Sequence, residues 1–138
     1  MKVSIFVMDT DIRWKQRFAN FKKAINQLTE FVEQPELNKF EVQGLIQCFE
    51  YTFELAWKTS KDYLEQEGFE IKSPRSAIQK AFQVQLIKDG HIWMDALEKR
   101  DLLAHTYDEN VTKEAEKLIR TAYYPMLTSL YAELEKLL

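Results

Sequence analysis

The sequence predicts an all-α protein, an antiparallel up-down helical bundle of four main helices plus one short helix. Apolar residues recur at helical spacing along most of the chain, and its 138 residues include only three glycines and three prolines. Only residues 3–7 favour a strand. We therefore expect an N-terminal arm at residues 1–10, strand-like or disordered, followed by one helical bundle domain over residues 11–138.

The first two main helices have clear boundaries. The first begins near residue 11, carries an apolar stripe with steps of three and four residues, and ends at Pro35. Asn38 and Glu41 have the spacing of a capping box, which predicts a second helix that continues to Gly68. The stripe of the first helix consists of Trp14, Phe18, Phe21, Ile25, Leu28 and Val32.

Ser73 followed by Pro74 predicts the start of a short third helix, which we expect to close at residues 89–90. A fourth helix begins near His91. The last helix runs from about Thr112 to the C-terminus, and Pro125 should bend it because proline removes one backbone hydrogen bond.

Composition limits the function classes. A formal net charge of −3 argues against a protein that coats nucleic acid by bulk electrostatics, and no apolar run is long enough to span a membrane, so we expect a cytoplasmic protein. One basic stretch is either a solvated helix face or a docking surface for RNA or an acidic partner. It consists of Arg13, Lys15, Arg17, Lys22 and Lys23. The single cysteine, Cys48, excludes an internal disulfide and fits a buried small side chain.

Most cofactor and metal chemistry lacks its usual motifs in this sequence. There is no glycine-rich phosphate loop, no dinucleotide fingerprint and no His-Glu-x-x-His pair. Two histidines are too few for a histidine-rich metal site, and His91 is the weaker candidate for a functional role. We expect no metal and no cofactor, which leaves the stretch RDLLAHTYDE, residues 100–109, as the place to look for chemistry.

Arg100 and His105 would not converge on a continuous helix. At about 100° per residue, five positions separate the two side chains by roughly 140° around the axis. They can act on one phosphate if the helix ends or loosens between Ala104 and Tyr107, or if a second copy of the chain brings its own motif alongside. Asp108 and Asn110 favour a break because both are good N-cap residues.

Ordinary structural roles also explain these residues. Asp101 and His105 have i,i+4 spacing, and a protonated histidine is favourable near a helix C-terminus. Arg100 and Tyr107 lie almost on one face, where an arginine commonly covers a tyrosine ring. Separately, Glu50, Glu54 and Lys58 form either an exposed salt-bridged stripe, which is the favoured interpretation, or part of a cleft.

The spacing Arg100-x4-His105-x-Tyr107 resembles the R-x4-6-H signature, followed by x-Tyr, of the HEPN superfamily. The specific resemblance is to HepT-like toxins, also called nucleotidyltransferase substrate-binding proteins. Residues 47–58, 73–78 and 93–109 look like the same subfamily, and the likeness covers about residues 11–138.

This resemblance implies a homodimer whose two motifs meet across a cleft, and a metal-independent endoribonuclease. It implies that His105 moves protons, that Arg100 stabilises charge on the phosphate, and that Asp101 is at most a supporting residue. The implied partner is a small nucleotidyltransferase, an antitoxin that transfers AMP to Tyr107 and so blocks the RNA substrate. The alternative is a non-catalytic subunit that presents substrate or nucleotide to the nucleotidyltransferase.

Overall fold

The computed structural model describes residues 3–138, with side chains described for residues 11–103 and 105–138, and over this range the chain is all-α as predicted. The two longest helices are α1, Val3–Glu33, and α2, Lys39–Gln66. The remaining helices are α3, Pro74–Gln83; α4, Gly90–Ala104; α5, Glu109–Leu118; and α6, Tyr124–Glu135. A π-helical turn, η1, Ile119–Tyr123, joins α5 to α6, so these three segments form one long last helix.

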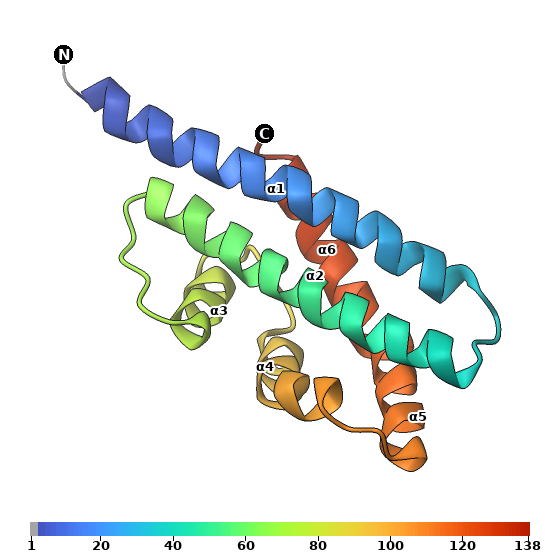
Figure 1. The fold of residues 1–138 in the computed structure, drawn as a ribbon. Coiled ribbons are helices and arrows are strands. Elements are labelled where there is room, and N and C mark those ends of the chain that lie inside the picture. Colours follow the sequence, from blue (N-terminus) through green and yellow to red (C-terminus); the bar gives the residue numbers. More distant parts are fainter. Residues whose placement is uncertain (1–2) are drawn as a thin grey trace.

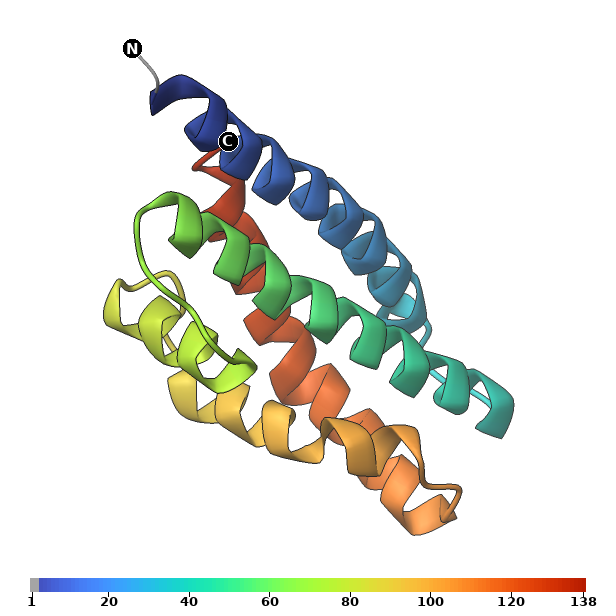
Figure 2. The same ribbon diagram turned by 60° about the vertical axis from the view of Figure 1, so that its left-hand side comes forward.

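Helices α1 and α2 run antiparallel and side by side, and α6 crosses behind them (Figure 1). Helices α3 and α4 pack on the opposite side of α2 from α1, and α5 lies below the C-terminal end of α4 (Figure 2). Helix α2 therefore contacts every other helix of the bundle. Among these neighbours of α2 is α4, the helix that carries Arg100.

The predicted apolar stripes form the core. Trp14, Phe21 and Leu28 of α1 are almost completely buried, and Phe18 of α1 stacks on Tyr131 of α6 with ring centroids 5.2 Å apart. The ends of α2 are also confirmed. Asn38 and Glu41 form the predicted capping box, and Gly68 follows the helix with a φ of 98°, in the left-handed region that glycine tolerates best.

Three expectations require correction. The first concerns residues 3–10, which continue α1 as a helix and are not the strand-like arm that the sequence suggested. The structure describes no strand with which residues 3–7 could pair, and a helix satisfies their backbone hydrogen bonds within the same segment. Residues 1 and 2 of the predicted arm lie outside the described residues, and the boundary at residue 11 stays a prediction.

The second correction concerns the short third helix, which begins at the predicted cap, Ser73, but ends at Gln83 instead of residues 89–90. Gln85 adopts a φ of 64°, and the amides of Leu86 and Ile87 return to the carbonyl of Ala81 at 2.8 and 3.3 Å. This arrangement resembles a Schellman closure with glutamine at the position that glycine usually takes. Leu86 continues the helical spacing of apolar residues, so the periodicity of the sequence predicted a helix that is too long.

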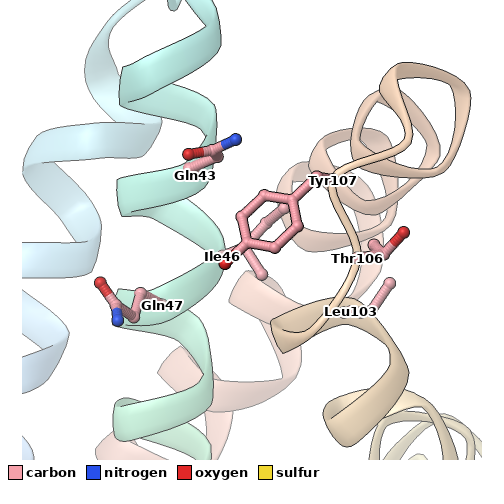
Figure 3. Close-up of a pocket in the computed structure, with 6 residues that line it drawn as sticks. All are labelled: Gln43, Ile46, Gln47, Leu103, Thr106 and Tyr107. Carbon is pink, nitrogen blue, oxygen red and sulfur yellow. The ribbon is translucent and has the colours of Figure 1, made fainter.

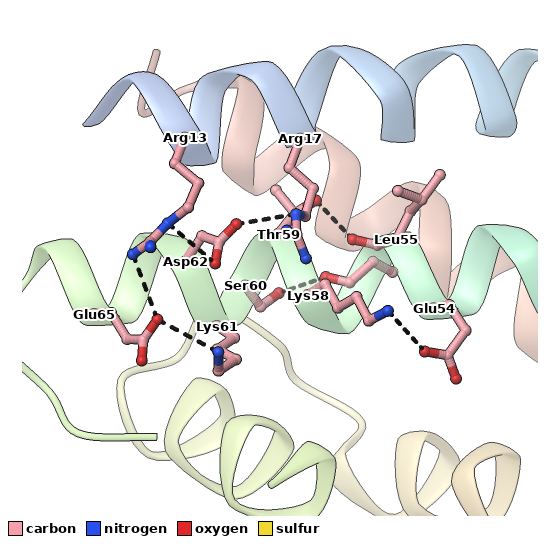
Figure 4. A network of polar contacts seen from close by, with 11 residues as sticks. Arg13, Arg17, Glu54, Leu55, Lys58, Thr59, Ser60, Lys61, Asp62 and Glu65 are labelled. Atoms are coloured by element: carbon pink, nitrogen blue, oxygen red, sulfur yellow. Dashed lines mark hydrogen bonds and ion pairs between the residues drawn. The ribbon is translucent and has the colours of Figure 1, made fainter. Parts of the chain in front are cut away.

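The third correction concerns the basic stretch of α1. Arg13 and Arg17 contact Asp62 of α2 at 3.7 and 3.0 Å, and Arg13 also lies 3.7 Å from Glu65 (Figure 4). The acids that balance these arginines come from α2 and not from the neighbouring sequence. Arg13 and Arg17 therefore join the two longest helices, a role that neither sequence alternative included, while Arg13 remains half exposed to solvent.

Pro125 lies beside an irregular turn of the last helix, which it was expected to bend. It lies in the first turn of α6, directly after the π-helical turn η1, where one extra residue is accommodated between α5 and α6. Tyr123 of this turn is fully buried, stacks on Phe49 at 5.1 Å, and donates a hydrogen bond of 2.5 Å to Asp95 of α4. The irregular turn thus anchors α4, the helix that carries Arg100.

Candidate functional site

The motif stretch spans the end of α4 and the start of α5. Helix α4 ends at Ala104, His105 caps it, and Asp108 caps α5 by accepting hydrogen bonds from the amides of Asn110 and Val111 at 2.9 and 3.3 Å. The predicted break before Asp108 is confirmed. Arg100 consequently projects from a helix, while His105 and Tyr107 belong to the short connection at residues 105–108, which we call the motif loop.

Arg100 is held by a carboxylate from α2. Its Nη1 donates a hydrogen bond of 2.6 Å to Oε1 of Glu54, and the two side chains are only 22% and 33% exposed. The other oxygen of Glu54 accepts a hydrogen bond of 3.1 Å from Trp57 and lies 3.7 Å from Nζ of Lys58. Glu54 therefore fixes one edge of the guanidinium group and leaves its remaining N–H groups for other acceptors.

Glu54 is a site residue that the favoured sequence interpretation missed. The predicted pair between Glu54 and Lys58 is present, but the shorter contact is the one with Arg100, 46 positions away in sequence. Helical spacing within α2 carries no information about α4. Only the less favoured interpretation, in which Glu50, Glu54 and Lys58 form part of a cleft, pointed to Glu54 as a site residue.

His105 is oriented by the backbone of its own helix. Its Nδ1 lies 2.8 Å from the carbonyl oxygen of Asp101, so this nitrogen carries the proton and donates it to the carbonyl. In the neutral form of the imidazole the other ring nitrogen, Nε2, is the one that can accept a proton. The Asp101 contact is made by the backbone and not by the carboxylate, so a supporting role for the Asp101 side chain stays a prediction.

Tyr107 projects from the motif loop toward α2 and is 78% exposed. It helps to line a small pocket of about 110 Å³ between the loop and α2 (Figure 3). The other lining residues are Gln43, Ile46, Gln47, Leu103 and Thr106. Tyr107 is thus accessible to a modifying enzyme, and any group attached to its hydroxyl would lie close to this pocket.

The three predicted site residues have three different partners. Arg100 bonds to Glu54, His105 to the Asp101 carbonyl, and Tyr107 faces the pocket beside α2. Within residues 11–103 and 105–138, no hydrogen bond joins these three side chains to one another, and the expected cover of Tyr107 by Arg100 is not formed. The helix end alone therefore does not join the motif into one hydrogen-bonded cluster.

Two groups that anchor α4 have shifted pKa values. The hydrogen bond from Tyr123 holds the pKa of the Asp95 carboxyl below its ordinary value, with help from Lys99. Burial, together with the same bond, raises the pKa of the Tyr123 hydroxyl. Asp95 is therefore charged and Tyr123 neutral at pH 7, which is the pairing that a strong hydrogen bond to a carboxylate requires.

Among the side chains that the structure describes, no group of three or more His, Cys, Asp or Glu residues is placed to hold a metal ion. Within the described helices, none is both long and apolar enough to cross a membrane. Cys48 is half-buried on α2, and burial raises the pKa of its thiol.

Comparison with known proteins gives a family. The model of a family described as "Nucleotidyltransferase substrate binding protein like" matches residues 16–136. The chain is also similar to the crystal structure of a Thermus thermophilus protein, with 32% sequence identity and a TM-score of 0.75. That similarity covers 83% of this chain and 98% of the other. No curated protein matches the chain.

Proposed function

Because the chain belongs to the nucleotidyltransferase substrate-binding-protein-like family, we propose that it acts together with a nucleotidyltransferase, and specifically that it is the toxin of a HEPN/minimal-nucleotidyltransferase pair. In this proposal it is a cytoplasmic, metal-independent endoribonuclease, active as a homodimer and silenced by AMP transfer to Tyr107. The observation that carries the proposal is the orientation of the His105 ring. Its Nδ1–H donates a hydrogen bond to the Asp101 carbonyl, so the ring presents Nε2 from an exposed loop.

The proposed cleavage uses the 2′-hydroxyl of the RNA. Nε2 of His105 takes the proton of this hydroxyl while its oxygen forms a bond to the adjacent phosphorus. The bond from phosphorus to the 5′-oxygen of the next nucleotide breaks, and that oxygen receives a proton from an imidazolium. The products are a 2′,3′-cyclic phosphate and a 5′-hydroxyl. Arg100 stabilises the charge on the phosphate oxygens with the N–H groups that Glu54 does not occupy.

The homodimer supplies what one chain lacks. Arg100 and His105 have separate partners in the single chain, and each chain has only one motif histidine to serve as both base and acid. A second motif across a cleft places another histidine and another arginine beside the same phosphate. Exposed Leu102, on the last turn of α4, gives this surface an apolar residue that a second copy can cover.

The decisive test of the endoribonuclease is cleavage of RNA by purified protein, with His91→Ala as the matched control for His105→Ala. His91 is the only other histidine, and it is exposed at the opposite end of α4. We expect His105→Ala to lower the cleavage rate by about 10²- to 10⁴-fold, as loss of a general acid–base group does, and His91→Ala to keep it. Equal cleavage by wild type and His105→Ala would contradict the proposal.

The silencing step is tested separately, by mass spectrometry after incubation with the partner nucleotidyltransferase and ATP. Added AMP should be found on Tyr107 and should disappear in Tyr107→Phe. Tyr51 is an internal control because it is also exposed, on α2. Modification of Tyr51, or of no tyrosine, would contradict this part of the proposal.

The second candidate is a non-catalytic subunit that presents substrate or nucleotide to the nucleotidyltransferase. The contact between Arg100 and Glu54 favours it, because the guanidinium charge is already partly balanced before any phosphate arrives. In that case the purified dimer leaves RNA intact, and addition of the chain increases nucleotide transfer by its partner. Induced expression with and without the partner, in wild type and His105→Ala, separates the two: only the toxin slows growth in a way that His105→Ala abolishes.

A further inference from the structure

We propose that the pocket between α2 and the motif loop binds one unpaired base of the RNA, stacked on the ring of Tyr107 and recognised by the amides of Gln43 and Gln47. This inference rests on the proposed function and deepens it by assigning the groups that contact a base. Arg100 and His105 act on phosphate and ribose, which are the same for every nucleotide, so any base preference needs other residues.

The ring of Tyr107 is available for stacking. It is 78% exposed, and in Figure 3 it lies across the gap between the motif loop and α2. A large exposed aromatic ring on a loop gains free energy when a flat ligand covers it, and stacking of a base on an aromatic side chain contributes about 1–3 kcal/mol. Every base has an aromatic face, so this contact supplies affinity without distinguishing between bases.

Gln43 and Gln47 supply the polar groups. They lie four residues apart on α2 and both line the pocket, although in Figure 3 the exposed amide of Gln47 is turned away from Tyr107. Each amide carries one acceptor oxygen and two N–H donors, which is the combination that reads the edge of a base. Among the described residues, neither amide forms a hydrogen bond within the protein, so both are available to a ligand.

The apolar part of the pocket suits a flat ring. Ile46 of α2 and Leu103 of α4 line it and are both buried, so their positions are fixed by the core. The volume of about 110 Å³ is well below the roughly 300–1,000 Å³ of pockets for larger ligands. One base fits such a space better than a complete nucleotide, whose ribose and phosphate would remain outside.

The pocket also has the right location for this role. Leu103, Thr106 and Tyr107 flank His105 in sequence, so a base bound there keeps its own ribose and phosphate near the motif loop. The same arrangement links recognition to silencing. A nucleotide attached to the Tyr107 hydroxyl would add bulk and negative charge at the pocket, and an RNA base could no longer stack there.

The test measures RNA binding in the His105→Ala background, in which the proposed cleavage cannot consume the ligand. Four single-stranded oligoribonucleotides of one base each, labelled with a fluorophore, are titrated with this protein and with the same protein carrying Gln43→Ala and Gln47→Ala. We expect the background protein to prefer one base. We expect the double variant to bind the preferred oligonucleotide about 5- to 10-fold more weakly and the other three nearly unchanged.

The matched control replaces Gln79 and Gln83 by alanine. These glutamines are also four residues apart and exposed, but they lie on α3, away from the pocket. Tyr107→Leu should weaken binding of all four oligonucleotides, and Tyr107→Trp should restore it because tryptophan stacks as well. All replaced residues are exposed, and thermal unfolding of each variant verifies that the fold is kept.

The outcomes separate this inference from the proposed function. If wild type cleaves RNA but the Gln43/Gln47 variant keeps the base preference and affinity of its background, the base pocket is wrong and the endoribonuclease stands. If wild type leaves RNA intact while the base preference is present and depends on these glutamines, the pocket stands and the endoribonuclease is wrong. Failure of all four oligonucleotides to bind would overturn the pocket.

Discussion

Among the arginine–carboxylate contacts that join helices in this protein, the two shortest differ in how far the carboxylate is removed from water. Arg17 of α1 lies 3.0 Å from Asp62 of α2, whose side chain is only 4% exposed. Arg100 of α4 lies 2.6 Å from Glu54 of α2, whose side chain is 33% exposed. Burial is the dominant influence on Asp62 and raises the pKa of its carboxyl, although Arg17 and Arg13 lower it.

The two contacts therefore have different consequences. Oδ2 of Asp62 is buried and accepts no well-aligned hydrogen bond from the described residues, so its ion pairs recover only part of the cost of desolvation. Glu54 remains partly hydrated, and the motif loop that follows the helix of its partner Arg100 carries the exposed residues His105 and Tyr107. The first contact aligns α1 with α2. The second orients an arginine beside a surface that a ligand can reach.

The largest expected difference between the two regions is in activity. On the proposed function, Arg100→Ala should lower RNA cleavage by at least about 100-fold, because a charged donor to the transition-state phosphate is lost. Arg17→Ala also removes an arginine paired with an α2 carboxylate, and it should leave the cleavage rate unchanged. Rates under single-turnover conditions check this. A comparable loss in both variants would mean that the arginines act through stability alone.

A smaller effect is expected when Arg100 keeps its charge but loses its fixed position. Glu54→Gln should reduce cleavage by about 10-fold, because a neutral amide forms a weaker hydrogen bond to the guanidinium group. The free energy of unfolding should change by less than about 1 kcal/mol, since the pair is partly exposed. Cleavage and urea unfolding are measured on the same sample, and unchanged or faster cleavage would show that Glu54 does not position Arg100.

The anchor of α4 gives a stability change that depends on pH. Tyr123→Phe should cost about 1 kcal/mol at pH 7, because it removes the hydrogen bond to the Asp95 carboxylate. The pKa of Asp95 is below its ordinary value of 3.8 in the folded protein, so this contribution is present above about pH 4 and is lost as the pH falls through the folded value.

Wild type and Tyr123→Phe should therefore converge in stability as the pH falls below about 4, which urea unfolding between pH 3 and pH 7 tests. A difference that stays constant over this range would show that the phenol contributes through packing and not through the charge of Asp95.

The smallest effect is expected for the buried contact. Asp62→Asn should change the free energy of unfolding at pH 7 by less than about 1 kcal/mol, because the ion pairs only partly offset desolvation of the carboxylate. The raised pKa of Asp62 means that its protonated form favours folding. This stabilisation is complete below the ordinary value of 3.8 and is lost as the pH rises through the folded value.

Wild type should therefore gain stability relative to Asp62→Asn as the pH is lowered from 7 to 3, and pH-dependent unfolding of both proteins checks the sign. A loss of several kcal/mol at pH 7 would instead show that the charged Asp62 stabilises the α1–α2 contact.

Most of the fold followed from local patterns. The stripe from Trp14 to Leu28, the capping box at Asn38, and the cap at Ser73 depend on residues a few positions apart, so the sequence contains all the information that they require. The same holds for the break before Asp108. The third helix was extended too far because Gln85 adopts a left-handed conformation that glutamine seldom takes, and no sequence signal marks it.

The candidate site was predictable in part. The motif gave Arg100, His105 and Tyr107 by position, and their proposed chemistry depends on residue type alone. The hydrogen bond of His105 to the Asp101 carbonyl is local, but an ion pair with the carboxylate was equally compatible with the spacing. Glu54, Gln43 and Gln47 could not be assigned from sequence because their contacts with α4 and the motif loop cross the bundle.

By itself the sequence determined the helices, their apolar faces, most of their ends and the residues of the motif, because each depends on interactions within a few turns. Only the tertiary structure decided which carboxylate each arginine meets. Asp62 and Glu54 lie on one helix, eight residues apart, yet packing buries one against α1 and places the other beside α4. Helix packing brings distant residues together, and that juxtaposition sets the burial, the pKa and the available partners of each charge.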